Sequence, residues 1–315
     1  MEMRMYNYPK MNMYFPSRLH IDYEKILEES SQWIIEFKLH SDNTMYKREN
    51  LTKLTCMCYP DGDYERTLLV NKWMIHVFAL DDITEGKVVK CPFFGSLAYH
   101  GSENKDVISL LDKCFEYDET PLVRSFADIW KQLKSITNKT WQQRFAENYV
   151  WYFKANDWEQ KNIEMNRVPT LAEYMNYRHY ISGVDAFFNL IEIASNIFIP
   201  DSAMANVTLQ RFVYLAGNVV AAANDIYSYE KEKRDGQINN LVHVMKHEYN
   251  ICDQEAIEKA TDFVNDEMKK LLVVERILPI FEEKVNDCVQ KYVDGCKSWI
   301  SGSHDWGLES GRYKI

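Results

Sequence analysis

The 315-residue sequence contains few residues that interrupt helices and no CxxC pair of cysteines. It has 11 glycines and 8 prolines, which favours long helices over a turn-rich β architecture. Its seven cysteines include no CxxC pair and are odd in number. We therefore expect reduced, mostly buried thiols in an intracellular protein, and no disulfide framework.

Long apolar runs and basic patches are also missing. The longest apolar run, residues 212–223, has 12 residues and includes Asn218, which is too short to span a bilayer. Residues 1–16 contain no apolar signal-peptide core. The net charge of −10 disfavours binding to nucleic acid or anionic membranes. The sequence also lacks a glycine-rich phosphate loop and a nucleophile elbow. These absences predict a cytoplasmic protein with no nucleic-acid partner and no membrane span.

The remaining composition and the periodic patterns predict one all-α domain. Hydrophobic residues make up 46% of the chain and aromatic residues 14%, enough for a large core and for an apolar pocket. No strand series, internal repeat or linker divides the chain, so we expect a single domain over 1–315, with 1–20 as a candidate N-terminal capping segment. We predict helices at 22–38, 65–85, 104–116, 121–136, 141–162, 170–199, 207–233, 253–276 and 280–301.

The first candidate metal motif is an acidic helix end. Asp81, Asp82 and Glu85 follow an apolar run and precede a glycine. Asp81 and Glu85 are spaced i, i+4 and share one helix face. Carboxylates at a helix C-terminus face the negative end of the helix dipole, so a bound cation such as Mg²⁺ would stabilise them. The alternative is an ordinary acidic helix end in water.

The second candidate metal motif lies on a later helix. Asn224, Ser228 and Glu232 are spaced i, i+4, i+8, so an amide, a hydroxyl and a carboxylate form one stripe. All three offer the hard oxygen ligands that suit Mg²⁺. The preceding segment, residues 219–223, is small and apolar, which indicates a buried helix. Burying this stripe without partners would be costly, although a polar face turned to water remains the alternative.

Together these motifs resemble the paired signature of microbial-type class I terpene synthases, DDxxE followed by NDxxSxxxE. Arg178 stands before the second motif where relatives carry an arginine that senses the diphosphate. Lys231 precedes the last ligand, where a lysine binds diphosphate in relatives. The C-terminal run ends in Trp306 and the pair Arg312-Tyr313, which resembles the RY pair that closes over the leaving group.

The resemblance implies a class I terpenoid synthase helical bundle around a central apolar cavity. It implies three Mg²⁺ ions that bridge a prenyl diphosphate, because a diphosphate of about −3 would otherwise be repelled by the carboxylates. Arg178, Lys231 and Arg312 would donate hydrogen bonds to the leaving group, and Tyr313 would add a hydroxyl. Phe78 and Trp306 are candidate cation–π walls for the carbocation, with plain core packing as the alternative.

The sequence departs from the family pattern in two places. Glu85 stands where many relatives have aspartate. His179 stands where relatives often have a second arginine, and it is followed by Ser182-Gly183, where relatives break the helix so that a backbone carbonyl points at the ionising carbon. Gly183 is compatible with such a break, since glycine weakens a helix interior. A close helix–helix contact at Ser182-Gly183 is the alternative.

The resemblance predicts conversion of farnesyl diphosphate (C15) to a sesquiterpene by a monomer or homodimer. Geranylgeranyl diphosphate (C20) is the alternative substrate. A chain-elongating prenyltransferase shares the architecture, but it uses an aspartate-rich second motif. A helical interaction module without activity is a further alternative, against which the two complete ligand sets argue.

Overall fold

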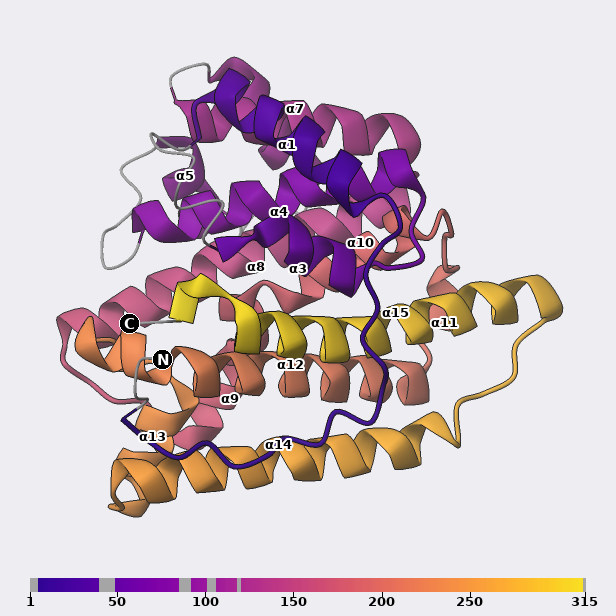
Figure 1. Ribbon diagram of the computed structural model, residues 1–315. Helices are drawn as coiled ribbons and strands as arrows, with labels where there is room; N and C mark the ends of the chain where they lie inside the picture. The colour runs from indigo at the N-terminus through magenta and orange to yellow at the C-terminus, as the bar shows by residue number, and fades with distance from the viewer. Residues whose placement is uncertain (1–4, 40–48, 85–91, 101–105, 118–119, 314–315) are drawn as a thin grey trace.

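The computed structural model describes residues 5–39, 49–84, 92–100, 106–117 and 120–313, and these ranges contain helices and no strands. This confirms the all-α prediction. Figure 1 shows the arrangement. The elements are α1 (Tyr23–Phe37), α3 (Leu51–Cys58), α4 (Tyr64–Thr84), α5 (Pro92–His100), α6 (Val107–Asp112), the 3₁₀ helix η1 (Lys113–Glu116), α7 (Pro121–Ile136), α8 (Lys139–Glu164), α9 (Leu171–Ser182), α10 (Val184–Ala194), α11 (Asp201–Met204), α12 (Val207–Arg234), α13 (Leu241–Tyr249), α14 (Asp253–Glu275), α15 (Glu283–Glu309) and the 3₁₀ helix η2 (Gly311–Tyr313).

Several predicted helix boundaries are wrong. The helix expected at 170–199 is two helices, because Gly183 adopts a left-handed conformation between them. The helix expected at 104–116 begins later and ends in a 3₁₀ turn. Helices α3, α5 and α13 were missed. Helix α3 is buried along almost its whole length, so it lacks the amphipathic period on which the prediction depended.

Helix α15 extends beyond the predicted end at residue 301 because its glycines serve close packing. A Cβ atom on Gly302 would lie 2.5 Å from the carbonyl oxygen of Met57 on α3, and one on Gly307 would lie 2.6 Å from the ring of Tyr227 on α12. Glycine is therefore required for contact with both neighbouring helices, although it weakens the helix itself. Because of this packing, α15 continues to Glu309, shortly before the pair Arg312-Tyr313.

Helix α12 occupies the centre of the bundle. It packs against α9, α10, α13, α14 and α15, and Figure 1 shows it between α15 and α14. Nearly every residue from Leu215 to Tyr229 is buried, as expected for a helix enclosed on all sides. The Asn206 side chain accepts hydrogen bonds from two backbone N–H groups and begins the helix. A buried central helix gives its polar residues fixed positions.

Aromatic side chains fill the core between α4, α7 and α8. Trp73 contacts Phe126, Phe145 and Tyr149, with ring centroids 4.7 to 6.1 Å apart. Each of these rings is almost fully buried. The contacts add to the hydrophobic stabilisation that burial gives large rings. The described helices include none long and apolar enough to cross a membrane.

Residues 5–20 form an extended N-terminal segment that crosses the outside of the bundle (Figure 1). The Tyr6 hydroxyl donates to Asp253 over 3.0 Å, and the Tyr8 hydroxyl donates to Glu230 over 2.8 Å. Asn12 bonds to Asn265 on α14. This segment is therefore tied to the C-terminal part of α12 and to α14.

Candidate active site

The bundle encloses a cavity of about 320 Å³ between α4, α8, α9, α10, α12 and α15. Along α12 its lining changes from apolar residues at 220–223 to polar residues from Asn224 onward, and α4 shows the same change from Met74 to Asp81. In Figure 1 both helices end on the side where the chain's C-terminus lies. The cavity therefore has an apolar interior and a polar end.

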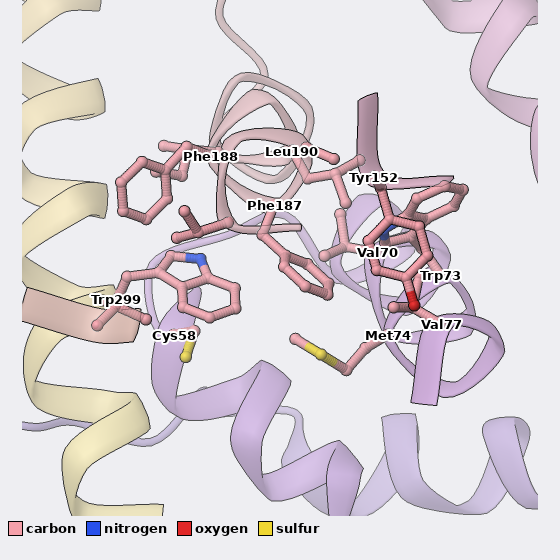
Figure 2. Packing of buried hydrophobic residues seen from close by; sticks show 14 of the residues in the cluster. Cys58, Val70, Trp73, Met74, Val77, Tyr152, Phe187, Phe188, Leu190 and Trp299 are labelled. Carbon is pink, nitrogen blue, oxygen red and sulfur yellow. The ribbon is translucent and has the colours of Figure 1, made fainter. Parts of the chain in front are cut away.

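The apolar interior is formed by side chains from several helices. Figure 2 shows Met74 and Val77 of α4, Tyr152 of α8 and Phe187 of α10 directed toward a shared space, with Trp299 of α15 beside it. All five line the cavity and are at most 8% exposed. Such a surface excludes water and presents ring faces, which can stabilise a cation.

The stripe on α12 faces the polar end of the cavity. Asn224, Ser228 and Glu232 all line it. The Glu232 carboxylate accepts a hydrogen bond of 2.9 Å from Asn240. Burial raises the pKa of Glu232, and repulsion from Asp225 adds to that effect. The three oxygen-bearing side chains predicted to share one face therefore do so, and that face is directed inward.

The acidic end of α4 contributes one described side chain to the same cavity. Asp81 lines it, and its carboxylate accepts a hydrogen bond of 3.0 Å from Arg312. The side chain of Asp82 and the whole of Glu85 lie outside the described part of the structure. Asp81 is half exposed, so it lies at the mouth of the cavity. The first and second motifs thus meet at one site.

Arg178 of α9 links to α12 at the polar end. Its Nη2 atom donates to Asp225 over 2.6 Å and to Asn224 over 3.0 Å. Burial acts to lower the pKa of Arg178, but the adjacent Asp225 carboxylate keeps it above the ordinary value. Its Nε atom is buried and has no hydrogen-bond partner among the described residues. Arg178 is therefore held rigidly, with one unsatisfied donor.

The C-terminal residues cover this polar end. The Asn224 amide donates to the Tyr313 hydroxyl over 2.8 Å. The Arg312 guanidinium lies over the Phe78 ring, 4.9 Å from its centroid. Phe78 in turn meets Trp306 edge-to-face, with centroids 6.1 Å apart. The predicted residues Phe78, Trp306, Arg312 and Tyr313 therefore form one group, and all four line the cavity.

Lys231 also lines the cavity, next to Glu232. Its ammonium group lies 3.9 Å from the Asp235 carboxylate one turn later on the chain. The side chain is 21% exposed, which leaves it room to change rotamer. Lys231 is thus placed beside the α12 stripe.

The chain changes direction at Ser182 and Gly183, beside the cavity. Gly183 has φ 65° and ends α9, and the next residue begins α10. The Ser182 hydroxyl donates to the His179 carbonyl over 2.9 Å and accepts from the Val184 N–H over 3.3 Å. Ser182 lines the cavity. The helix therefore breaks at Gly183, and the alternative of a close helix–helix contact is not supported, because a Cβ atom on Gly183 would meet the Tyr152 ring of α8 at an ordinary 3.6 Å.

His179 does not join the site. Its Nε2 atom donates to the Asn218 side-chain oxygen over 2.7 Å, and its ring stacks on Tyr214, with centroids 4.7 Å apart. A Cβ atom on Gly217 would lie 2.4 Å from the His179 ring, so the ring packs directly on the α12 backbone. It lines a different hollow, one to which Arg178 does not contribute. The histidine thus serves packing between α9 and α12.

Glu159 of α8 is a site residue that sequence reasoning missed. It lines the cavity with Asp81 and Glu232. Burial raises its pKa to about 8; Arg178 opposes this shift, whereas Glu232 and Asp81 reinforce it. Nothing in the local sequence distinguishes it, because α8 carries several other acidic residues. The polar end therefore holds more carboxylates than its cations neutralise.

This excess of oxygen donors fits divalent metal ions. Among the described residues, no group of three His, Cys, Asp or Glu side chains could hold a metal by itself. The α12 stripe, however, contains one carboxylate, one amide and one hydroxyl, and hard cations accept all three. The partly buried carboxyl groups of Glu159 and Glu232 both have raised pKa values, first because of burial and then because other carboxylates lie nearby. A bound cation would stabilise their ionised forms.

A family model described as terpene synthase family 2, C-terminal metal binding, matches residues 72–270. The chain is 30% identical over 284 residues to a (+)-T-muurolol synthase, (2E,6E)-farnesyl diphosphate cyclizing, of Roseiflexus castenholzii, covering 89% of this chain and 86% of that protein. It is 28% identical to a germacrene A synthase of Nostoc punctiforme, covering 95% and 93%.

Solved structures share the fold over nearly the whole chain. An α-eudesmol synthase matches with a TM-score of 0.80 and 21% identity, covering 96% of this chain and 99% of that one. The germacradien-4-ol synthase of Streptomyces citricolor matches with a TM-score of 0.79 and 19% identity, with the same coverage of both chains. At these identities the likeness shows that the helical architecture is common to all three.

Proposed function

The chain belongs to the terpene synthase family, and from this premise we propose that it ionises farnesyl diphosphate with Mg²⁺ and converts the carbocation to a sesquiterpene. As a terpene synthase it is a carbon–oxygen lyase. The observation that carries the proposal is the inward-facing stripe of Asn224, Ser228 and Glu232, which shares one cavity with Asp81. That arrangement joins a diphosphate-binding end to an apolar interior.

The metal ligands we propose come from both motifs. Asp81, with Asp82 and Glu85, would hold metal on the α4 side, and the stripe on α12 would hold a further ion. When bound, three Mg²⁺ ions supply the positive charge that a departing diphosphate requires. The raised pKa values of Glu159 and Glu232 support this assignment, because a divalent cation would stabilise the ionised carboxylates that burial and neighbouring carboxylates now disfavour.

Four side chains are proposed to bind and orient the diphosphate. Arg178 has a buried, unsatisfied Nε donor next to the metal stripe. Lys231 and Arg312 line the same end of the cavity, and Tyr313 offers a hydroxyl. Charge-assisted hydrogen bonds from fixed donors stabilise the charge that develops on the leaving group. Because Asp225 holds Arg178 in place, little reorganisation is needed during ionisation.

The interior is proposed to shield and guide the carbocation. Phe78 and Trp306 present rings near the polar end, and Tyr152 and Phe187 lie deeper. The turn at Ser182-Gly183 is proposed to direct backbone carbonyl dipoles at the ionising carbon. This proposal is supported by the left-handed Gly183 and by the position of Ser182 in the cavity lining.

The size of the cavity favours a C15 substrate. Its volume of about 320 Å³ is at the lower end of the range for small-molecule sites. The name of the Roseiflexus relative specifies farnesyl diphosphate, which supports the same choice. Geranylgeranyl diphosphate is the second candidate, and it would require the cavity to expand.

Residues 1–315 are proposed to form one catalytic domain, with the N-terminal segment as part of it. The hydrogen bonds from Tyr6, Tyr8 and Asn12 to α12 and α14 support this view. Through Glu230 and Asp253 the segment would be held against the outside of α12 and α14. We propose a monomer or homodimer.

Incubation of the purified protein with C10, C15 and C20 prenyl diphosphates and Mg²⁺ tests the proposal. We expect release of diphosphate and a sesquiterpene from the C15 substrate, detected by gas chromatography–mass spectrometry. A further incubation adds isopentenyl diphosphate. A longer prenyl diphosphate as product would identify a chain-elongating prenyltransferase and overturn the assignment, as would a diterpene formed only from the C20 substrate.

A further inference from the structure

The C-terminal pair is anchored by a residue outside every motif. Glu49 lies two residues before the first residue of α3, and its carbonyl oxygen accepts hydrogen bonds from the Trp306 indole over 2.9 Å and from the Ser310 hydroxyl over 3.1 Å. Its carboxylate accepts a hydrogen bond of 3.1 Å from Nη1 of Arg312. One residue therefore holds the last turn of α15 and the following 3₁₀ helix at three points.

The Glu49–Arg312 ion pair is buried, unlike the surface pair next to it. The side chains of Glu49 and Arg312 are 9% and 6% exposed. Lys53 and Glu309 join the same two parts of the chain, but Glu309 is 58% exposed. An exposed pair contributes little, whereas loss of one partner from a buried pair leaves an uncompensated charge. The buried carboxylate is therefore the contact that matters for Arg312.

Arg312 uses different nitrogens for Glu49 and Asp81, two carboxylates that it contacts in the described part of the chain. Nη1 bonds to Glu49, while Nη2 bonds to Asp81 over 3.0 Å. Asp81 is the proposed metal ligand at the mouth of the cavity. If Asp81 bound a metal ion, Nη2 would be released to donate to a phosphate oxygen, while Nη1 could keep its hydrogen bond to Glu49. A guanidinium has five N–H donors in a fixed plane, so both contacts can exist together.

We propose that Glu49 is a positioning residue, which holds Arg312 over the cavity mouth and aims it at the diphosphate. The inference rests on the proposed function, because it assigns the direction of a donor to that substrate. Glu49 itself bears a negative charge and would repel diphosphate, so its benefit must pass through Arg312. Because the guanidinium is already held in place, less entropy is lost when the site closes and water is excluded from it.

Glu49→Gln isolates the role of the carboxylate. The substitution preserves the size of the side chain and leaves the carbonyl contacts to Trp306 and Ser310 available. We expect kcat/KM to fall about 10- to 100-fold, the range for a lost hydrogen bond between charged groups. We also expect weaker binding of inorganic diphosphate in the presence of Mg²⁺, measured by calorimetry. Glu309→Gln is the matched control and should leave both quantities unchanged.

A double-mutant cycle separates positioning from a structural effect. In an Arg312→Gln background, Glu49→Gln should cause no further loss of kcat/KM or of diphosphate affinity, since the group it acts through is gone. All variants are compared at a temperature where circular dichroism shows them folded. Additive losses, or a Glu49→Gln variant with the parental diphosphate affinity, would overturn the proposal.

The binding measurement also separates a failure of the proposed function from a failure of the role proposed for Glu49. If the parental protein makes no product from any prenyl diphosphate, the proposed function fails. The calorimetric comparison of Glu49→Gln with the parental protein still tests the role of Glu49, because it requires no turnover. If the parental protein is active and the cycle is additive, only the inference about Glu49 fails.

Discussion

The guanidinium of Arg178 and the carboxylate of Asp225 lie 2.6 Å apart, with their side chains only 7% and 2% exposed. Asp225 also accepts hydrogen bonds from the Tyr174 hydroxyl over 2.6 Å and from the Leu241 N–H over 2.9 Å. One carboxylate thus joins α9, α12 and α13 beside the proposed metal stripe. Arg178 consequently has two roles, as the counter-ion of Asp225 and as a proposed ligand of diphosphate.

Arg178→Ala should therefore lower both stability and activity. It leaves Asp225 buried without its counter-charge, which we expect to cost about 3 kcal/mol or more of unfolding free energy. It also removes a donor to the leaving group, so kcat should fall about 100-fold or more. The measurements are urea unfolding and steady-state turnover, with the helical circular-dichroism spectrum retained at low temperature.

Arg144→Ala is the matched control for that variant. Arg144 donates to Glu192 over 2.7 Å, and Glu192 is fully buried, so this pair joins α8 to α10 without lining the candidate active site. The variant should lose comparable stability and keep its turnover under folded conditions. Equal loss of turnover in both variants would remove Arg178 from the proposed chemistry and leave it a structural role only.

The proposed metal stripe predicts that substitutions of two glutamates on α12 differ in their effect on the Mg²⁺ requirement. Glu232→Gln should raise the Mg²⁺ concentration needed for half-maximal activity about tenfold or more, because it neutralises the stripe's only carboxylate. Glu230→Gln alters a residue that bonds to Tyr8 and does not line the cavity, and its Mg²⁺ requirement should match that of the parental protein. EDTA should abolish activity and added Mg²⁺ restore it. Indistinguishable Mg²⁺ titrations of the two variants would contradict the assignment.

The sequence predicted those parts of the site that depend on one helix. The spacing of Asn224, Ser228 and Glu232 places them on one face whatever surrounds them, and the structure directs that face into the cavity. The acidic end of α4 was also predicted from local spacing, and Asp81, the one residue of that motif whose side chain is described, lines the same cavity. The resemblance to a family then supplied the pairing of the two helices, which local spacing cannot give.

Contacts between distant parts of the chain were not predictable. Nothing near Glu49 or Glu159 marks them as site residues, because their significance arises from what packs against them in the fold. The partner of Arg178 is Asp225, a motif residue to which the sequence assigned no role. The helix predicted over 280–301 stops short, whereas α15 continues through Gly302 and Gly307, which allow close packing. Each of these features depends on tertiary contact.

The buried side chain of His76 should make the unfolding free energy depend on pH. It is fully buried on α4, between the Ser125 hydroxyl at 2.9 Å and the Tyr149 hydroxyl at 3.1 Å. Burial lowers its pKa from 6.5 to about 3. Between these values the unfolded chain binds a proton that the folded chain does not, so stability rises with pH and is lost as pH falls below 6.5.

The unfolding free energy should therefore fall by up to about 1.4 kcal/mol for each pH unit below 6 because of this residue. His76→Gln removes the titrating group and should reduce the slope between pH 6 and 4. Urea titrations at several pH values measure it, with the exposed His247→Gln as control. A His76→Gln variant that keeps the parental slope would show that the histidine is not held neutral in the fold.

Gly183 and Gly236 provide a matched pair for testing the turn beside the cavity. Both have positive φ, 65° and 79°. A Cβ atom on Gly183 would contact the Tyr152 ring at 3.6 Å without a clash, and one on Gly236 would meet nothing within 4 Å. Alanine at either position therefore introduces similar backbone strain, about 1 kcal/mol, and little steric conflict.

The two substitutions should differ in catalysis. Gly183→Ala perturbs the backbone that carries the cavity-lining Ser182, so kcat should fall about 10- to 100-fold and the ratio of products should change, because small displacements of a positioned group are costly. Gly236→Ala lies after the end of α12 and should keep both the rate and the product ratio of the parental protein. The measurements are turnover and gas chromatography of the products under conditions where both variants are folded. If both variants retain the parental product ratio and rate, the turn at Gly183 only connects α9 to α10, and its backbone carbonyls have no part in ionisation.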